Sequence, residues 1–288
     1  MNYYKDFDLK EAGRLIRLAL MEDIGKGDVT SELLISPYSN SKAELLIKEN
    51  GIIAGLKIFE YVFSIIDKKI KVKFKTKDGQ KVRKGEVIGS VQGNTRKLLK
   101  GERVALNLLQ RMSGIATYTN FLVRKLNNNS IKIIDTRKTT PNLRIFEKLG
   151  VLTGGGENHR FGLYDMILIK DNHIEANGGI SKTLDILAAR KKKLKQMIEI
   201  EVKNIKEFEL VVSKGRDIIS RVMLDNFRLE NVKKAVKLNN NLFEIEISGG
   251  INEKNISRYR NIKGIDFISI GSVTHSVNSM DISLNFIT

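Results

Sequence analysis

Apolar residues in the first part of the chain change from helical to strand-like spacing and back. Residues 8–22 place apolar side chains on one stripe, at intervals of three and four, which predicts an amphipathic helix. Alternation with a period near two then predicts short strands over residues 43–47, 51–55 and 70–76. Helical spacing returns over residues 95–112. We therefore expect a first region that mixes helices with short strands.

A second helix should follow the one over residues 95–112. Ser113 has the side chain of a good N-cap, and helical spacing continues after it to about residue 126. In the first of these helices, Arg103 and Asn107 are one helical turn apart and lie away from the apolar seam. The local sequence assigns Arg103 no function.

The remainder of the chain repeats a short apolar run, a group of polar residues and a segment long enough for a helix. The six apolar runs span residues 131–134, 166–169, 197–202, 222–224, 243–247 and 267–270. The polar positions Glu201, Asp225, Ser248 and Gly271 follow one another at intervals of 24, 23 and 23 residues. Such intervals hold one loop, one helix and one strand, as in parallel sheets. Six repeats without a nucleotide-binding glycine motif after the first favour an α/β barrel.

In such a barrel, the loops that follow the strands open at a single mouth. The cations that follow the first two strands, the carboxylates Glu201 and Asp225, and the turns at Ser248 and Gly271 would therefore meet. The sequence thus predicts one site from motifs that are far apart along the chain.

The cations of this expected site are concentrated in one stretch. Between residues 135 and 173 they are Arg137, Lys138, Arg144, Lys148, His159, Arg160, Lys170 and His173. Five of them offer more donors than one phosphate requires, namely Arg137, Lys138, His159, Arg160 and Lys170, and guanidinium groups bind carboxylates as well as phosphates. The turns Ser248-Gly249-Gly250 and Gly271-Ser272 suit a phosphate, because backbone N–H groups can hold it where no Cβ obstructs their approach. We therefore expect a phosphorylated substrate and a second one that carries carboxylates.

The carboxylates Glu201 and Asp225 leave several roles open. They could bind Mg²⁺ beside a phosphate chain, directly or through water, or hydrogen-bond sugar hydroxyls. They could also stabilise a developing cation, or simply neutralise the neighbouring Lys and Arg side chains. In each case we expect them to be ionised at neutral pH, because cations surround them.

Composition limits the class of protein. The 288 residues are 29% charged and 41% hydrophobic, as in folded soluble proteins. No apolar run approaches the ~20 residues of a membrane span, and the N-terminus has no signal-peptide pattern. The absence of cysteine excludes disulfides, thiolate zinc sites and a cysteine nucleophile. We expect a cytoplasmic protein that does not bind membranes.

The formal net charge of +17 has two interpretations. It could indicate a polyanionic partner, or it could reflect a composition rich in lysine, as in the run of residues 191–193. A nucleic-acid-binding protein should show a basic helix or an aromatic stacking platform, and the sequence shows neither. We therefore expect no nucleic-acid partner.

Eight motifs together resemble one enzyme family. They are Glu22–Thr30 (EDIGKGDVT), Gly101–Asn107 (GERVALN), Ser113–Thr117 (SGIAT), Asp135–Pro141 (DTRKTTP), Asn158–Arg160 (NHR), Lys170–His173 (KDNH), Ser248–Gly250 (SGG) and Gly271–Ser276 (GSVTHS). In this order they resemble quinolinate phosphoribosyltransferases, and the resemblance extends over nearly the whole chain. Two positions depart from the family pattern: Asn142 stands where glycine is usual, and Gly150 stands where alanine is common.

The resemblance implies the fold of a type II phosphoribosyltransferase of the α/β class. An N-terminal α/β sandwich domain would cover residues 1–112, and a C-terminal tail, residues 277–288, would join it. An incomplete α/β barrel would form the catalytic domain over residues 113–276. The family resemblance also implies a homodimer, or a higher oligomer, in which Arg103 reaches the neighbouring subunit's site.

The resemblance further implies an activity and roles for particular residues. The reaction would join quinolinate to phosphoribosyl pyrophosphate, with release of pyrophosphate and CO₂, to give nicotinate mononucleotide for NAD biosynthesis. Around the quinolinate carboxylates the family would place Arg103, Arg137, His159, Arg160 and Lys170. Around the ribose, the pyrophosphate and its Mg²⁺ it would place Lys138, Glu201 and Asp225. Around the 5′-phosphate it would place Ser248, Gly249, Gly250, Gly271, Ser272 and His275.

Within this family assignment, Lys138, Lys170, Glu201 and Asp225 are the expected catalytic residues. Glu201 and Asp225 would favour positive charge on the ribose ring, while Lys138 and Lys170 would stabilise the carbanion that follows loss of CO₂. An alternative is a related type II enzyme that uses nicotinate or another acceptor. The number of cations favours a dicarboxylate, because nicotinate has a single carboxylate to bind.

Overall fold

The computed structural model describes residues 3–193 and 195–287. The chain forms two compact units. Unit 1 comprises residues 1–121, 138–156 and 273–288, and unit 2 comprises residues 122–137 and 157–272. The chain thus passes between the units several times, and its C-terminal segment belongs to the same unit as its N-terminus.

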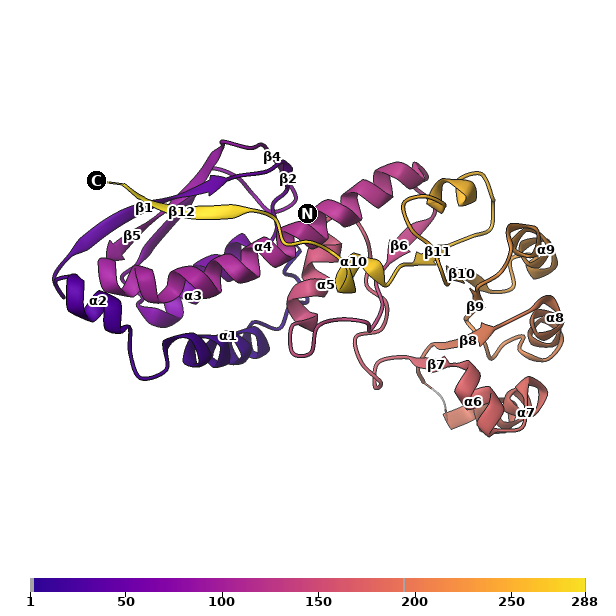
Figure 1. Ribbon diagram of the computed structural model, residues 1–288. Helices are drawn as coiled ribbons and strands as arrows, with labels where there is room; N and C mark the ends of the chain where they lie inside the picture. Colours follow the sequence, from indigo (N-terminus) through magenta and orange to yellow (C-terminus); the bar gives the residue numbers. More distant parts are fainter. Residues whose placement is uncertain (1–2, 194, 288) are drawn as a thin grey trace. The chain divides into compact units, whose positions relative to one another are not determined.

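Unit 1 is built on an antiparallel sheet of four strands. Its strand order is β12-β1-β5-β3, so that the last strand of the chain pairs with the first (Figure 1). The strands are β1 (Asn40–Ile47), β3 (Lys71–Phe74), β5 (Val87–Asn94) and β12 (Ile282–Ile287), with a separate pair formed by β2 (Gly51–Ile52) and β4 (Lys81–Val82). The helices are α1 (Leu9–Ile24), α2 (Val29–Leu34), α3 (Leu56–Ile66), α4 (Thr95–Leu126, which continues into unit 2) and α5 (Arg144–Thr153). These elements confirm a mixed first region of helices and short strands.

The core of unit 1 lies between its sheet and its helices. The most apolar helix, α3, contributes Phe59 and Phe63, which are fully buried and meet edge to face with ring centroids 5.2 Å apart. Apolar residues of β1, such as Leu45, face the same cluster. Burial of aromatic and aliphatic side chains of this size is the main driving force for folding such a layer.

One element of the sequence-based prediction is wrong. Residues 95–126 form a single helix, α4, and Ser113 does not begin a second one. The Ser113 side chain accepts a hydrogen bond from Ala54 N at 3.0 Å and donates one to Ala54 O at 3.3 Å. Its hydroxyl therefore ties the helix to a neighbouring segment and is not available as a cap.

Unit 2 alternates strands with helices. Its strands are β6 (Lys132–Ile134), β7 (Ile167–Ile169), β8 (Ile198–Val202), β9 (Arg221–Asp225), β10 (Glu244–Ser248) and β11 (Phe267–Ser269). Its helical segments are α6 (Asp171–Ala176), α7 (Ile180–Arg190), α8 (Ile205–Lys214) and α9 (Leu229–Asn239), with 3₁₀ turns at Lys191–Lys193 and Ile256–Tyr259. A short helix, α10 (Ser272–His275), follows β11. Each of the six predicted apolar runs coincides with one of the six strands.

The strands of unit 2 form one parallel sheet with β6 and β7 at its edges. Its order is β6-β11-β10-β9-β8-β7, and every recorded pairing between neighbours is parallel. Helices α7, α8 and α9 lie side by side along one face of the sheet (Figure 1). Because the edge strands β6 and β7 are those of the first two repeats, the sheet is a barrel left open between them. This confirms the predicted incomplete α/β barrel.

The central strands of this sheet carry charged residues on one face. Along β8 the fully buried Ile200 alternates with Glu199 and Glu201, and along β10 the fully buried Glu246 lies between two isoleucines. Since side chains alternate between the two faces of a strand, the isoleucines share one face and the acids the other. The opposite faces of the sheet are therefore chemically different. Among the described residues, no helix is both long enough and apolar enough to cross a membrane.

Candidate active site

The carboxyl ends of the six parallel strands place several predicted site residues at one edge of unit 2. Glu201 lies near the end of β8, Asp225 and Ser248 are the last residues of β9 and β10, and Lys170 directly follows β7. In register, Ser248 pairs with Asp225 across the two strands. Gly271 lies two residues beyond the end of β11. The structure therefore brings these residues together within unit 2, as strand phasing predicted.

Glu201 and Asp225 act on each other electrostatically. Burial raises the pKa of Glu201, the negative charge of Asp225 raises it further, and the positive charge of Lys170 opposes both effects. Glu201 is 8% exposed and lines a cavity of about 300 Å³ together with Asp171 and Lys203. A buried carboxylate with a second carboxylate beside it suits a cation that both can bind. Their oxygen ligands fit Mg²⁺, which prefers such donors.

The turn after β10 requires its two glycines. Gly249 has φ +89°, and a Cβ there would lie 2.2 Å from the Asn226 side-chain oxygen. Gly250 also has a positive φ of +62°, and the space where its Cβ would be is open. Asn226 itself is fixed, since its main-chain N–H donates to Ser248 O at 2.9 Å and its amide donates to Asp225 at 2.8 Å. At Gly250 no side chain covers the backbone of this turn, so that a phosphate could approach its N–H groups closely.

Ser272 adds a polar group to this edge of unit 2. Its hydroxyl oxygen is buried and has no hydrogen-bond partner in the part of the chain that the structure describes. A buried hydroxyl without a partner is costly, so a ligand oxygen would complete its hydrogen bonding.

Arg160 and Arg137 form a pair of like charges in unit 2. Burial lowers the pKa of Arg160, and the positive charge of Arg137 lowers it further. The Arg160 guanidinium donates from Nη1 to Met166 O at 3.2 Å, while its buried Nε has no partner among the described residues. Two neighbouring guanidinium groups, one with an unused donor, are arranged for an anion with more than one oxygen.

His159 lies directly before Arg160 and uses both of its ring nitrogens. Nδ1 accepts the Arg160 main-chain N–H at 2.7 Å, and Nε2 lies 2.9 Å from Glu199 Oε2 and 3.4 Å from Glu246 Oε2. The His159 main-chain N–H donates to Asp135 at 2.9 Å. The ring is therefore held by unit 2 itself and in turn holds the backbone of Arg160.

Glu199 and Glu246 are completely buried beneath this histidine. Burial by itself would lower the pKa of His159, but hydrogen bonds and charge attraction from the two glutamates outweigh it and raise the pKa to about 9. Burial raises the pKa of Glu199 to about 7. Arg221 closes the cluster, with Nη1 3.4 Å from Glu246 Oε2. The group thus retains a proton at neutral pH that separate side chains would release, and that proton belongs to the cluster as a whole.

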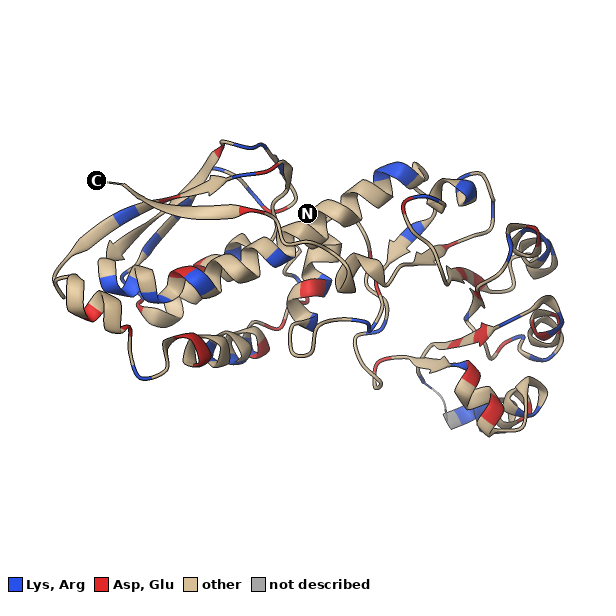
Figure 2. Ribbon diagram, viewed as in Figure 1, with Lys and Arg blue, Asp and Glu red and all other residues tan. Residues whose placement is uncertain are grey.

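Sequence reasoning missed Glu199, Glu246 and Arg221. The signal was present, because β8 reads Ile-Glu-Ile-Glu-Val and β10 reads Glu-Ile-Glu-Ile-Ser. Alternation of this kind was read as part of an apolar run instead of as a strand with one polar face. Figure 2 shows acidic residues, in red, on the strands of this sheet. On this polar face Glu199, Glu201 and Glu246 are buried, whereas Glu244 at the start of β10 is exposed.

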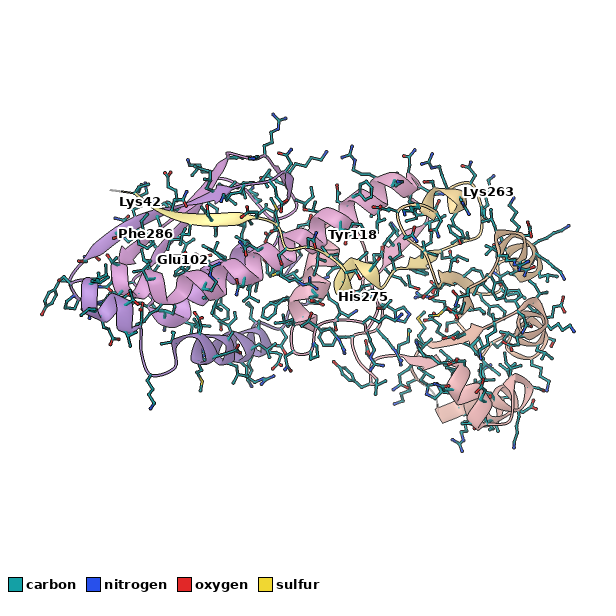
Figure 3. All side chains as sticks on the ribbon, viewed as in Figure 1. Lys42, Glu102, Tyr118, Lys263, His275 and Phe286 are labelled. Atoms are coloured by element: carbon teal, nitrogen blue, oxygen red, sulfur yellow. The ribbon has the colours of Figure 1, made fainter. Side chains whose placement is uncertain are left out.

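Three predicted site residues lie in unit 1. Arg103 is exposed on α4, and Lys138 is exposed in the segment before α5. His275 ends α10 (Figure 3), where its Nδ1 lies 2.6 Å from Ser276 Oγ. The remaining predicted residues belong to unit 2. Lys170 is the N-cap residue of α6, and its main-chain N–H donates to His173 Nδ1 at 2.9 Å, which gives His173 a capping role.

Comparison with known proteins identifies the family. Residues 28–113 match the quinolinate phosphoribosyl transferase N-terminal domain, and residues 115–285 match the C-terminal domain of the same family. The chain belongs to the quinolinate phosphoribosyltransferase family. The two matches are adjacent and in the order in which these domains are named.

Individual relatives agree with the family over nearly the full length of the chain. The chain is 43% identical to the probable nicotinate-nucleotide pyrophosphorylase (carboxylating) of Bacillus subtilis (strain 168), with 94% of this chain and 92% of that protein covered. It is 42% identical to quinolinate phosphoribosyltransferase (decarboxylating) 2b, mitochondrial, of Nicotiana tabacum, with 98% and 83% covered. The crystal structure of NadC from Streptococcus pyogenes is similar with a TM-score of 0.91 and 39% identity, covering 99% of this chain and 100% of that one.

Proposed function

We propose that the protein transfers the 5-phosphoribosyl group from phosphoribosyl pyrophosphate to quinolinate with decarboxylation. The products would be nicotinate mononucleotide, pyrophosphate and CO₂, a step in the biosynthesis of pyridine nucleotides. The proposal is supported by relatives that carry this activity in their names and are about 40% identical over most of the chain. The cytoplasmic location expected from the sequence is part of this proposal.

The pair of Arg137 and Arg160 is the main structural reason to propose quinolinate as the acceptor. Their mutual repulsion and the unused Nε of Arg160 favour a ligand with at least one carboxylate facing both guanidinium groups. Lys170, at the end of β7 on the same edge of unit 2, would bind the second carboxylate. His159 would serve this site by fixing the backbone of Arg160. The role of Arg103 rests on the family motif Gly101–Asn107 alone.

Glu201 and Asp225 would serve the phosphoribosyl pyrophosphate. Both are acceptors, and they could hold Mg²⁺, directly or through water, or the ribose hydroxyls. When it is bound, Mg²⁺ would offset the negative charge that develops on the leaving pyrophosphate. The turns at Ser248-Gly249-Gly250 and Gly271-Ser272 would hold the 5′-phosphate. Two observations support this assignment: the open space beside the backbone of Gly250, and the buried Ser272 hydroxyl, which has no hydrogen-bond partner among the described residues. Lys138 and His275 are assigned to this substrate by their motifs.

The chemistry requires no protein nucleophile. The lone pair of the pyridine nitrogen forms a bond to ribose C1 while the bond from C1 to the pyrophosphate oxygen breaks. Glu201 and Asp225 would stabilise the positive charge that the ribose ring develops in this step. The bond from the ring to the adjacent carboxylate then breaks to give CO₂, and its electron pair stays on the ring carbon beside the cationic nitrogen. Lys138 and Lys170 would stabilise this carbanion until it takes a proton from solvent.

We also propose that the protein acts as a homodimer. Unit 1 exposes large apolar side chains on its first two helices and the loop that follows, with Leu33 82% and Tyr38 88% exposed. Exposed apolar groups of this size near one another are typical of an interface, and a second copy of the chain is the occupant that the family resemblance implies. Sedimentation would test this: Leu33→Asp should yield monomers, whereas wild-type protein that sediments as a monomer would contradict the proposal.

One experiment tests the activity directly. Protein, Mg²⁺ and phosphoribosyl pyrophosphate are mixed with either quinolinate or nicotinate, and pyrophosphate and CO₂ are measured. We expect both products in equal amounts with quinolinate, and neither without Mg²⁺. Pyrophosphate release with nicotinate and none with quinolinate would refute the proposal and favour the alternative acceptor.

A further inference from the structure

A hydrogen-bond network in unit 1 holds four segments of the chain together. At its centre, the guanidinium of Arg111 on α4 donates from Nε and Nη2 to Oε1 of Glu147 on α5, at 3.0 and 2.8 Å. Its Nη1 donates to Val277 O at 2.8 Å, and its Nη2 also donates to Thr274 O. One side chain thus links α4 to α5 and to the C-terminal segment.

The other end of the network reaches the segment before α5. Glu147 is fully buried; its Oε1 accepts from Thr140 Oγ1 at 2.8 Å and its Oε2 from Thr140 N at 3.1 Å. Thr274, also fully buried, donates from Oγ1 to Lys138 O at 2.8 Å. The short stretch from Lys138 to Thr140 is therefore held at both ends by buried side chains.

The network fixes main chain next to two residues of the proposed function. Thr274 and Val277, whose carbonyls Arg111 binds, lie on either side of His275. Thr274 binds the carbonyl of Lys138 itself. A buried ion pair contributes little net stability compared with apolar residues of the same size, because desolvation offsets the attraction. The buried pair of Arg111 and Glu147 is therefore better explained by precise placement of the segments that it joins than by a gain in stability.

We propose that Arg111, Glu147 and Thr274 are positioning residues for phosphoribosyl pyrophosphate, and that they act by fixing the main chain that carries Lys138 and His275. The proposal rests on the proposed function, in which Lys138 and His275 bind this substrate. None of the three need touch the substrate, and the hydrogen bonds of the network described above do not involve Arg160 or Lys170, which we assign to quinolinate.

A matched pair of variants at Thr274 tests the proposal. Thr274→Val keeps the shape of the side chain but leaves Lys138 O without its buried partner, whereas Thr274→Ser retains the hydroxyl. Loss of one such hydrogen bond should raise the KM for phosphoribosyl pyrophosphate about tenfold and change the KM for quinolinate less than about twofold. Serine should restore most of the loss. A merely structural role would affect both constants alike, or neither.

A second variant and a binding measurement distinguish a loss of positioning from a failure of Thr274→Val to fold. Arg111→Lys keeps the charge but loses the paired donors, and it should show the same selective loss; Arg124→Ala, at an exposed arginine of the same helix, should show none. Titration calorimetry with phosphoribosyl pyrophosphate and Mg²⁺, without acceptor, measures binding independently of turnover. Unchanged binding in Thr274→Val and Arg111→Lys, or an equal loss for both substrates, overturns the inference. A wild-type protein that binds phosphoribosyl pyrophosphate but does not convert quinolinate would instead refute the proposed function alone.

Discussion

Replacing Glu246 by glutamine should make the stability of the protein less dependent on pH. Glu246 is fully buried, with His159 Nε2 and Arg221 Nη1 each 3.4 Å from its Oε2. It is ionised, because the hydrogen bond and the charge of His159 outweigh the effect of burial and lower the pKa of Glu246. Glu246→Gln preserves the size of the side chain and removes the charge. The variant therefore isolates the electrostatic part of the buried cluster.

The expected magnitude follows from His159. Its pKa rises from 6.5 to about 9, and since each pKa unit corresponds to about 1.4 kcal/mol, the rise contributes up to about 3 kcal/mol to the free energy of unfolding. A raised pKa means that the folded state binds the proton more tightly. The contribution is thus complete below pH 6.5 and is lost as the pH rises through about 9. Glu246→Gln should lose about half of it at pH 6, because Glu199 also raises the pKa of His159 and remains in the variant, and almost none at pH 10.

The assay is unfolding in urea, followed by circular dichroism, of the wild type and the variant at pH 6 and pH 10. At pH 6 the variant should be less stable by about 1 to 2 kcal/mol, equivalent to a fall of roughly 2 to 8 °C in Tm. Glu244→Gln is the control, since Glu244 is on the same strand and also pairs with Arg221, yet its side chain is 45% exposed. A loss at pH 10 as large as that at pH 6 would refute the reasoning, because it would show that packing and not the shared proton is responsible.

Three further predictions concern the candidate site and the fold. Arg160→Lys should raise the KM for quinolinate at least about tenfold and leave the KM for phosphoribosyl pyrophosphate unchanged, because lysine lacks the planar, forked donors of arginine. Steady-state kinetics would measure both constants, and an equal rise in the two KM values would contradict the prediction. Glu201→Gln or Asp225→Asn should raise the Mg²⁺ concentration needed for half-maximal pyrophosphate release about tenfold or more, and an unchanged requirement would remove these residues from the metal site. Gly114→Ala should destabilise the protein by about 1 to 3 kcal/mol in thermal unfolding, although alanine is the better helix former, because its Cβ would meet Asn278 O; stabilisation would refute the close packing.

The parallel sheet of unit 2 could be predicted because its signal is local and repeated. Each strand is a short apolar run, each crossover needs a helix, and the spacing between Glu201, Asp225, Ser248 and Gly271 counts those units directly. Parallel strands then force their carboxyl ends to one edge. For the same reason, the gathering of Glu201, Asp225 and Ser248 was predictable before any distance was known.

Features that depend on contacts distant in sequence were not predictable from local pattern. Ser113 has the residue type of a cap, but its hydroxyl binds Ala54, 59 residues earlier, and the helix continues through it. Arg111 looks like an ordinary helix cation, yet its partners Glu147 and Val277 lie 36 and 166 residues away. In both cases the side chain's chemistry was visible in the sequence, and only its partner was not.

The buried acids show most clearly why a pattern can mislead. In an antiparallel sheet, alternating glutamate and isoleucine would indicate one face in water and one in the core. Here Glu199 and Glu246 lie on parallel strands, 0% exposed, because the face opposite the helices is the interior of an open barrel. Acids in such a place need a cation or a proton to remain, and His159 together with Arg221 supplies them. The cluster thereby fixes the histidine whose Nδ1 holds the backbone of Arg160. The buried acids thus hold the histidine that binds the backbone of Arg160, the arginine that we propose binds quinolinate.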